Sequence, residues 1–203
     1  MRTAFRFVFD AIAFLVTLPF WLPVRLAALV GGALHKRVFQ SGSQTVALFP
    51  GDLGNLLRRA FYRVTLEACD ARSTVCFGTI LSSPRARIGA GVYIGAYCSL
   101  GEVTIEDDCL LGSMVTVLSG KMTHRFDRTD IPMRMQGGEV RRVTLHADCW
   151  LGNGSIVMVD IPSGVVVGAG AVVTKTPEPG VILGGNPARE IGRRAVAASA
   201  TRP

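Results

Sequence analysis

The sequence predicts a mainly β fold, in which short strands and tight turns stack into a coil behind an apolar, helical N-terminal segment. Three observations predict it. Aliphatic residues recur every six positions from Val75 onward, small or acidic residues follow most of them, and the first 50 residues are apolar without this period. A fixed short period is typical of a repeat fold. A period of six also excludes a helix, whose apolar positions recur every 3.6 residues.

The composition limits the class of protein. The chain has 203 residues, enough for one substantial core, and its 49% hydrophobic content with 23 glycines is more apolar than that of an ordinary soluble enzyme. The net charge of +7 comes from scattered basic residues, so nucleic acid is not an expected partner. The five cysteines show no CxxC spacing. We therefore expect buried thiols in a reducing compartment, and neither a disulfide framework nor a metal site.

The N-terminal segment contains two apolar runs, AIAFLVTLPFWLPV and LAALVGGAL, separated by Arg25. Each is shorter than the ~20 residues that a bilayer crossing needs. We expect a pair of apolar helices, broken by Pro19 and Pro23, that lies on an anionic membrane surface through residues 1–37. The basic residues expected at the lipid headgroups are Arg2, Arg6, Arg25, Lys36 and Arg37.

Two alternatives for this segment stay open. One is a helical hairpin buried against the rest of the protein or against an oligomer mate. The other is a cleaved signal peptide, although Asp10 precedes the apolar core and no A-x-A site closes it.

The next segment, DLGNLLRRAFYRVTL at residues 52–66, has apolar residues at helical spacing, with Asp52 as the expected N-cap. We expect this amphipathic helix to cover the open end of the following coil, and the alternative is that its arginines, Arg58, Arg59 and Arg63, also touch the membrane. The predicted organisation is an apolar helical segment at 1–50, a capping helix and linker at 51–74, the repeat domain at 75–194 and a disordered tail at 195–203.

The repeat has fourteen large aliphatic positions. They are Val75, Leu81, Ile88, Ile94, Leu100, Ile105, Leu111, Val117, Leu145, Leu151, Val157, Ile161, Val167 and Val173. Smaller residues lie between them, so each unit turns one large and one small side chain inward. Three units close a triangular coil of about 18 residues, and fourteen registers give about five coils. Each coil buries its aliphatic side chains only against its neighbours, so both ends need caps.

The repeats, one long interruption at residues 118–142 and the closing GGNPAREI occur in an order that resembles the hexapeptide-repeat acyltransferases. The resemblance covers about residues 75–194. It implies a left-handed parallel β-helix, a homotrimer, and acetyl-coenzyme A as a co-substrate rather than a permanently bound cofactor. The sequence is similar to the serine and sugar acetyltransferase-like proteins of bacterial polysaccharide pathways.

The interruption, which begins LSGKMTHRFDRTD, carries the expected catalytic base. The resemblance implies that this loop reaches a neighbouring subunit and that His124 deprotonates the acceptor, a role that suits a side chain titrating near neutrality. Many relatives carry their histidine directly after the glycine or two residues past it, where this chain has Lys121 and Met122. Asp127 either holds the imidazole or binds the acceptor, or is a solvated loop carboxylate. His146 is expected to be structural or exposed at a coil corner.

Three further residues are assigned by the resemblance. The backbone amide of Asn153, in WLGN, would bind the oxyanion of the tetrahedral intermediate. Trp150 would lie against the pantetheine arm, or else pack at a coil corner. Glu102 matches an acidic acceptor-binding position approximately, and the alternative is a solvated turn glutamate.

The late repeats carry the expected coenzyme A site. Gly168 and Ala169, in GAGAVVTK, let backbone amides approach the pantetheine chain. Lys175, together with Pro187 and Arg189 in GGNPARE, would surround the nucleotide phosphates. No Rossmann pattern surrounds these glycines, which argues against a dinucleotide. Whether the arginines at 193 and 194 take part stays open.

The sequence therefore predicts an acetyl-coenzyme A-dependent O-acetyltransferase acting on a sugar hydroxyl of a polysaccharide or lipid-linked precursor. Its expected location is the cytoplasmic side of the inner membrane. Two other functions stay open: N-acyl transfer to an amino sugar or a serine-type acceptor, and a non-catalytic β-helix scaffold.

Overall fold

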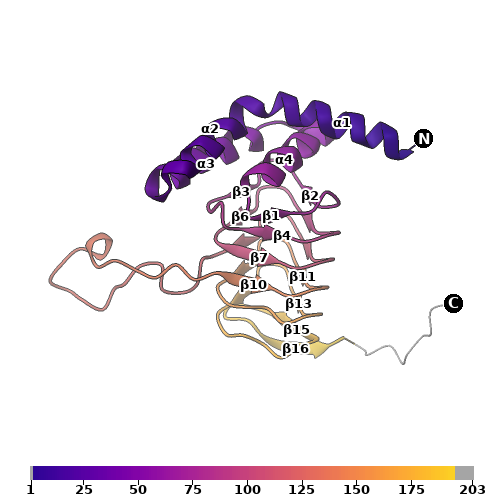
Figure 1. Cartoon of the computed structure of the whole chain (residues 1–203). Coiled ribbons are helices and arrows are strands. Elements are labelled where there is room, and N and C mark those ends of the chain that lie inside the picture. Colours follow the sequence, from indigo (N-terminus) through magenta and orange to yellow (C-terminus); the bar gives the residue numbers. More distant parts are fainter. Residues whose placement is uncertain (1, 195–203) are drawn as a thin grey trace.

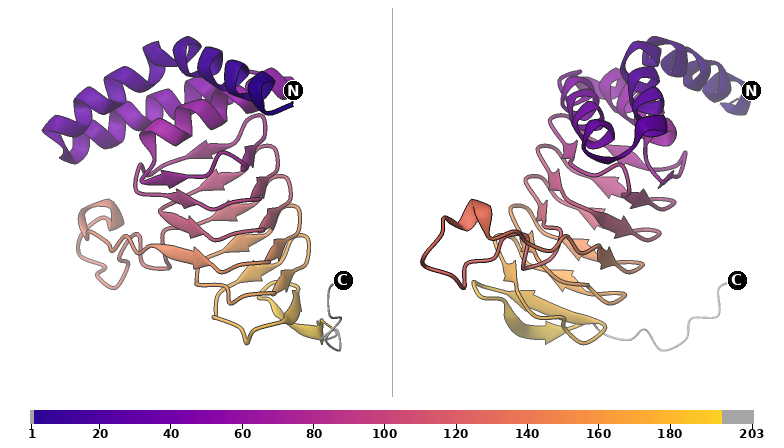
Figure 2. Two further views of the ribbon diagram at one scale, coloured as in Figure 1. Left: turned by 45° about the vertical axis from the view of Figure 1, so that its right-hand side comes forward. Right: turned by 60° about the vertical axis from the view of Figure 1, so that its left-hand side comes forward.

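A computed structural model describes residues 2–194, with side chains from residue 9 onward. Within this range a layer of helices lies across one end of a stack of short strands, and one long loop leaves the stack sideways (Figures 1 and 2). The helices are α1 (Arg2–Val16), α2 (Leu18–Val30), α3 (Gly32–Ala47) and α4 (Gly51–Thr65). The predicted disordered tail at 195–203 and the side chains of Arg2 and Arg6 lie outside the described residues.

The described strands form three sheets, one on each side of a triangular coil. Sheet A contains β1 (Ala68–Cys69), β4 (Arg87–Ile88), β7 (Val103–Ile105) and β10 (Val143–Leu145). Sheet B contains β2 (Thr74–Val75), β5 (Tyr93–Ile94), β8 (Leu110–Leu111), β11 (Trp150–Leu151), β13 (Val166–Val167), β15 (Val181–Gly184) and β16 (Arg189–Arg193). Sheet C contains β3 (Ile80–Leu81), β6 (Ser99–Leu100), β9 (Thr116–Val117), β12 (Ile156–Val157) and β14 (Val172–Val173).

The coil is the predicted left-handed parallel β-helix. Every strand pair is parallel except β15 with β16, which pair antiparallel at the end farthest from the helices. The described strands make five complete coils and the first strand of a sixth, with Ile161 completing sheet A of the fifth coil by bridging Leu145. The predicted number of coils is thus confirmed.

The core also confirms the repeat register. All fourteen predicted aliphatic positions are at most 2% exposed. The smaller inward positions are equally buried, including the thiols of Cys98, Cys109 and Cys149. The coil begins earlier than expected, at β1 instead of Val75. The reason is that β1 has Ala68 and Cys69 where later coils have a large aliphatic residue, so the period does not reveal it.

The N-terminal helices break at one of the two predicted prolines. The chain bends by 65° between the apolar part of α1 and α2, before Pro19, which lies in the first turn of α2. The predicted break at Pro19 is thus confirmed. Pro23 lies inside α2 without ending it, and the second break is at Gly31 (φ 73°), so the prediction of Pro23 as a breaker is wrong. Among the described helices none alone is long and apolar enough to span a bilayer, whereas the bent pair α1–α2 meets that test.

Helix α4 packs against β1, β2 and the other three helices, and so closes the first coil. Its Arg58 is fully buried, which rules out the predicted alternative that Arg58 touches a membrane. The Arg58 Nε donates to the carbonyl of Val75 at 2.8 Å, and Nη1 donates to the carbonyl of Phe49 at 2.6 Å. The N-cap of α4 is Pro50, and Asp52 lies in the first turn instead of at the predicted cap position.

The turns between sheets form three corners that run down the coil. Corner BC, where the chain passes from sheet B to sheet C, comprises residues 76–79, 95–98, 112–115, 152–155 and 168–171. Corner CA comprises residues 82–86, 101–102, 118–142, 158–160 and 174–180. Residues 118–142, here called the arm, are the long excursion of corner CA in the third coil.

Candidate active site

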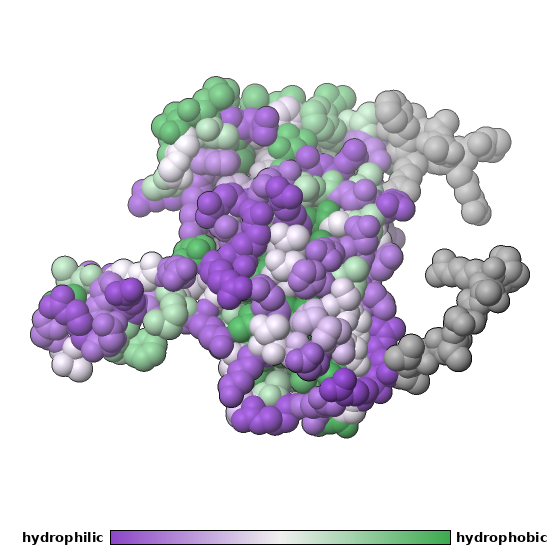
Figure 3. Space-filling model, turned by 60° about the horizontal axis from the view of Figure 1, so that its bottom comes forward, coloured by the Kyte–Doolittle hydropathy of each residue, from purple (hydrophilic) through white to green (hydrophobic). Residues whose placement is uncertain are grey.

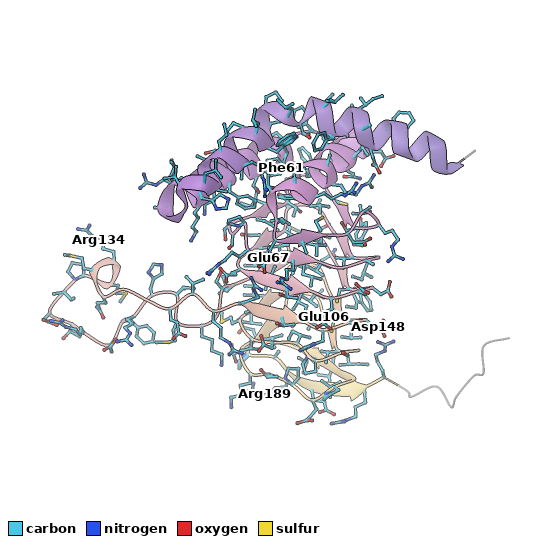
Figure 4. The ribbon with its side chains drawn as sticks, in the orientation of Figure 1. Phe61, Glu67, Glu106, Arg134, Asp148 and Arg189 are labelled. Atoms are coloured by element: carbon cyan, nitrogen blue, oxygen red, sulfur yellow. The ribbon has the colours of Figure 1, made fainter. Side chains whose placement is uncertain are left out.

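The arm is a narrow two-limbed projection. Its limbs are joined by backbone hydrogen bonds from Arg141 N to Ser119 O (2.9 Å), from Glu139 N to Met122 O (2.7 Å) and from Arg125 N to Gly137 O (3.0 Å). Its tip, which carries Arg134 and the short 3-10 helix η1 (Met133–Met135), lies far from the coil (Figure 4). The backbone pairing gives the arm a defined course although little of it is buried.

His124 lies on the outgoing limb with its side chain exposed. Within the described residues no hydrogen bond or ion pair holds the imidazole, and Asp127 makes none to it. A Cβ at Gly138 would lie 2.0 Å from the carbonyl oxygen of Thr123, so a glycine is needed where the limbs meet beside His124. The imidazole is therefore carried on a fixed backbone and is accessible, and the role proposed for Asp127 in holding it has no contact in support.

The base of the arm is fixed by ion pairs. Arg141 pairs with Asp160, and Arg142 Nη2 donates to Glu67 Oε2 at 2.6 Å. Arg87 also pairs with Glu67, and these two guanidinium groups lower the pKa of Glu67 to about 2. Glu67 therefore stays ionised at all ordinary pH values, and it connects the returning limb to sheet A.

Glu102 lies one coil above the arm at corner CA and is 7% exposed, so the alternative of a solvated turn glutamate is wrong. Its Oε2 accepts from Arg85 Nη2 at 2.7 Å and from Ser83 Oγ at 3.2 Å. Its backbone N–H donates to the hydroxyl of Ser119 at 2.8 Å, at the start of the arm. This carboxylate is a fixed group that connects the arm to the coil above it.

Trp150 and Asn153 lie on other parts of the coil. Trp150 is about half exposed on the outer face of sheet B, between Leu110 and Val166 of the adjacent coils. Asn153 is at corner BC, where its Oδ1 accepts from Ser113 N at 2.9 Å. Sheet C separates this corner from the arm, which points away from the coil (Figure 1). One chain therefore does not bring His124 and Asn153 together.

The backbone N–H of Asn153 has no acceptor among the described residues, as an oxyanion donor requires. The equivalent amides of Ala96 and Ala169, in other coils, are likewise without one. This outward donor is thus a property of the corner rather than of Asn153 alone, and it recurs at Ala169, where a pantetheine amide is expected.

The residues predicted to bind coenzyme A gather around β14. Gly168 and Ala169 directly precede this strand at corner BC, and Lys175 follows it at corner CA. Ala188 N donates to Val172 O at 2.8 Å, which places Pro187 and Arg189 beside the same strand. Lys175 and Arg189 line one cavity of about 240 Å³, here called the lower pocket, together with Thr176 and Glu190.

Two more cavities lie along corner CA, one on each side of the arm. The arm pocket, about 410 Å³, lies below the arm and is lined by residues that include Lys121, Met158 and Thr176. Because Thr176 also lines the lower pocket, the two cavities adjoin. The upper pocket, about 330 Å³, lies between α3 and the coil and is lined by residues that include His35, Lys36 and Glu102. This position of His35 could not be predicted from the sequence, because nothing in the repeat pattern places α3 against corner CA.

Comparison with sequence families gives one match, the hexapeptide repeat of succinyl-transferase, over residues 102–120 and 143–175. The two matched segments flank the arm. A chloramphenicol acetyltransferase from Klebsiella aerogenes is 31% identical over 116 residues, which is 50% of either chain. Another, from Agrobacterium fabrum, is 45% identical over 49 residues, or 23% of either chain. The chain thus spans about half the length, or less, of the curated relatives it matches.

Solved structures agree with the fold. A maltose O-acetyltransferase from Clostridium difficile superposes with a TM-score of 0.66 at 19% identity, over 78% of this chain and 87% of that one. A variant of AntD, an N-acyltransferase from Bacillus cereus in complex with dTDP-4-amino-4,6-dideoxyglucose and coenzyme A, gives a TM-score of 0.52 at 29% identity, over 60% and 70%. The expected similarity to the hexapeptide-repeat acyltransferases is confirmed for the repeat region.

Proposed function

We propose that the protein is an acetyl-coenzyme A-dependent O-acetyltransferase that acts on a sugar hydroxyl. The observation that carries the proposal is the arm, which interrupts a hexapeptide repeat and carries an accessible histidine, with two adjoining cavities below it whose far end is lined by the cationic side chains of Lys175 and Arg189. Similarity to named acetyltransferases over the repeat region supports the reaction class, and likeness to a maltose O-acetyltransferase in fold is in keeping with a sugar acceptor.

In the proposed reaction, an imidazole nitrogen of His124 takes the proton of the acceptor hydroxyl as its oxygen attacks the thioester carbonyl carbon. The carbonyl oxygen becomes an oxyanion, and the backbone N–H of Asn153 donates to it. Collapse of the tetrahedral intermediate breaks the carbon–sulfur bond. The departing coenzyme A thiolate receives the proton held by His124, which leaves an acetyl ester and the neutral base.

This chemistry requires more than one subunit, and we propose a homotrimer. Within one subunit, His124 and Asn153 lie at different corners of the β-helix. A neighbouring subunit placed beside the arm would present its own Asn153 to His124. The outer face of sheet B, with Tyr93, Leu110 and Trp150, is an exposed apolar surface of the kind that an oligomer buries. The arm in turn exposes Met122 and Phe126 beside His124.

Removing the cations of the lower pocket should weaken donor binding. We expect Lys175→Ala and Arg189→Ala each to raise the KM for acetyl-coenzyme A about tenfold, the effect of losing one charge-assisted hydrogen bond to a phosphate, with kcat little changed. Steady-state kinetics with acetyl-coenzyme A and with its dephospho form show which phosphate is bound. Arg72→Ala is the matched control, because Arg72 lies in the first coil, at the other end of the stack, and pairs with Asp70. Equal KM values in all three variants would contradict this site.

The likeness to AntD favours a second candidate, N-acyl transfer to an amino sugar, since that structure holds an amino sugar nucleotide. An acceptor screen with neutral sugars, amino sugars and serine, followed by mass spectrometry of the product, separates ester from amide formation. A chain that neither binds nor consumes acetyl-coenzyme A would instead be a β-helix scaffold.

We further propose that the helical layer lies on the cytoplasmic surface of the inner membrane. Apolar side chains gather over this layer (Figure 3), and Leu29 and Val30 are 85% and 74% exposed. Arg25, Lys36 and Arg37 are exposed beside them, as binding to anionic lipid requires.

Polar substitution on this surface should release the protein from lipid. We expect Leu26→Gln, Leu29→Gln and Val30→Gln, combined, to abolish flotation of the full chain with phosphatidylglycerol vesicles. Ile191→Gln changes a side chain with 70% exposure at the far end of the coil and should float normally. Point changes are preferable to truncation at residue 50, which would expose Phe61 and Tyr62 of α4. Flotation of the triple variant at wild-type levels would contradict the membrane contact.

A further inference from the structure

The upper pocket is a cavity with several charged side chains in its lining, and none of them has a role in the reaction described above. It lies between the first turns of α3 and corner CA of the first two coils, directly above the base of the arm. The polar residues that line it are His35, Lys36, Ser83, Arg85 and Glu102. The arm adds one apolar residue, Val140. Side chains from the helical layer, the coil and the arm thus meet in one place.

Glu102 gives this pocket a hydrogen-bond acceptor. Its side chain is nine-tenths buried, and its Oε2 is occupied by Arg85 and Ser83. Its Oε1 lies 4.0 Å from Arg142 Nε, which is beyond hydrogen-bond distance, and no hydrogen bond to Oε1 is formed within the described residues. A carboxylate oxygen in a mostly buried position is stabilised by a donor, and a sugar hydroxyl can supply one.

The α3 wall gives the pocket cationic donors. Among the side chains that the structure describes, neither that of His35 nor that of Lys36 has a hydrogen bond or an ion pair, and both line the cavity. Arg85 adds a second permanent cation, so two permanent cations and an imidazole surround one carboxylate. Such a set of donors is suited to a phosphate, while the carboxylate disfavours a ligand that is an anion throughout.

We propose that the upper pocket binds a sugar joined to a phosphate or diphosphate, with His35 and Lys36 on the phosphate and Glu102 Oε1 accepting from a sugar hydroxyl. This rests on the proposed acyltransferase function and names its acceptor class. Stacked coils are about 4.8 Å apart, so a ligand here lies about one or two coils above the base of the arm. The sugar nearest the phosphate is therefore the part of the acceptor that is presented to the arm.

Binding without any acyl donor tests the proposal. Calorimetric titration of the full chain with glucose 1-phosphate should give a dissociation constant that His35→Gln combined with Lys36→Gln raises about tenfold or more. Arg37→Gln removes the same charge from the adjacent position of α3, outside the lining, and should leave it unchanged. No binding to the wild-type chain, or equal constants for all three proteins, would overturn the proposal.

Glu102→Gln tests the hydroxyl contact separately. The substitution should weaken binding of glucose 1-phosphate severalfold and leave inorganic pyrophosphate, which has no sugar, unaffected or bound more tightly. A merely structural loss would weaken both ligands together, and that result would contradict the assignment of Oε1.

Two further measurements identify what the phosphate of the acceptor is attached to. Recruitment to phosphatidylcholine vesicles that contain a polyprenyl diphosphate sugar, lost in the double variant, identifies a lipid-linked acceptor. Tight UDP-glucose binding with no such recruitment identifies a nucleotide-linked acceptor. Both results support the pocket. If glucose 1-phosphate binds while acetyl-coenzyme A is neither bound nor consumed, the acyltransferase proposal fails and the phosphate site remains.

Discussion

His124→Ala is expected to lower kcat by two or more orders of magnitude while the affinity for coenzyme A stays within a factor of about two. General-base catalysis contributes about 10²–10⁴ in rate, and the imidazole is the group on the arm that can supply it near neutral pH. Coenzyme A binding should survive, because its proposed contacts at Lys175 and Arg189 line a different cavity. Single-turnover kinetics for the chemical step and calorimetry for coenzyme A separate the two effects.

The control for this prediction is His146→Ala. His146 lies in the coil, where its Nδ1 is 3.1 Å from Glu106 Oε1, on the sheet A side away from the arm. Its removal should leave kcat within a factor of about two. Retained turnover in His124→Ala, or an equal loss in both variants, would mean that another group is the base.

The same substitution tests the trimer through subunit mixing. His124→Ala and Asn153→Pro should each be nearly inactive alone, since the first removes the base and the second removes the backbone N–H that is proposed to bind the oxyanion. When the two variants are refolded together in equal amounts, about one site in four should combine an intact arm with an intact Asn153 from the neighbouring subunit. Absence of any recovered activity, with mixed oligomers confirmed by mass spectrometry, would place both halves of the site in one chain.

Arg58→Leu is expected to cost the largest amount of stability of any single substitution considered, about 3–5 kcal/mol. The buried guanidinium donates to Val75 O, Phe49 O and Asn55 Oδ1 at 2.8, 2.6 and 2.6 Å. Burial lowers the pKa of Arg58, and these acceptors compensate for the lost hydration. Leucine would leave several buried acceptors unpaired, each at a cost of about 1–3 kcal/mol.

Urea denaturation followed by circular dichroism measures this effect. Arg63→Leu, on the same helix, is the control: its side chain is 43% exposed and 3.9 Å from Asp10, so its loss should change stability by less than about 1 kcal/mol. A change of less than 1 kcal/mol for Arg58→Leu would mean that the helical layer does not depend on this residue.

The repeat could be predicted because its signal is local. Each inward aliphatic residue, from Val75 to Val173, recurs at a spacing that only a short strand and a tight turn satisfy, and all fourteen are buried. The strand at Ala68–Cys69 could not be predicted because its side chains are small and do not continue the aliphatic period. The helix break before Pro19 could be predicted because a proline in the first turn of a helix lacks only an N–H that has no intrahelical partner there. Pro23 lies inside α2 without breaking it, and no proline marks the second break at Gly31.

The sequence predicts which residues share a cavity only where those residues are close together in the chain. Lys175 and Arg189 lie on one cavity beside β14, as their closeness in sequence indicates. The burial of Glu102 could not be predicted, because its partner Arg85 comes from the preceding coil. His35 and Lys36 are far from Glu102 in the sequence. They meet because α3 packs on corner CA, and the six-residue repeat, which does not extend into the helices, does not predict this contact.

Because each coil touches only the coils next to it, the two ends of this stack are energetically insulated from each other. The residues proposed to bind the sugar phosphate of the acceptor belong to the helical layer and the first two coils, and those proposed to bind the nucleotide phosphates of the donor belong to the last. A change of acceptor therefore needs no adjustment of the donor end. Such an architecture allows evolution to exchange one substrate specificity while inheriting the other unchanged.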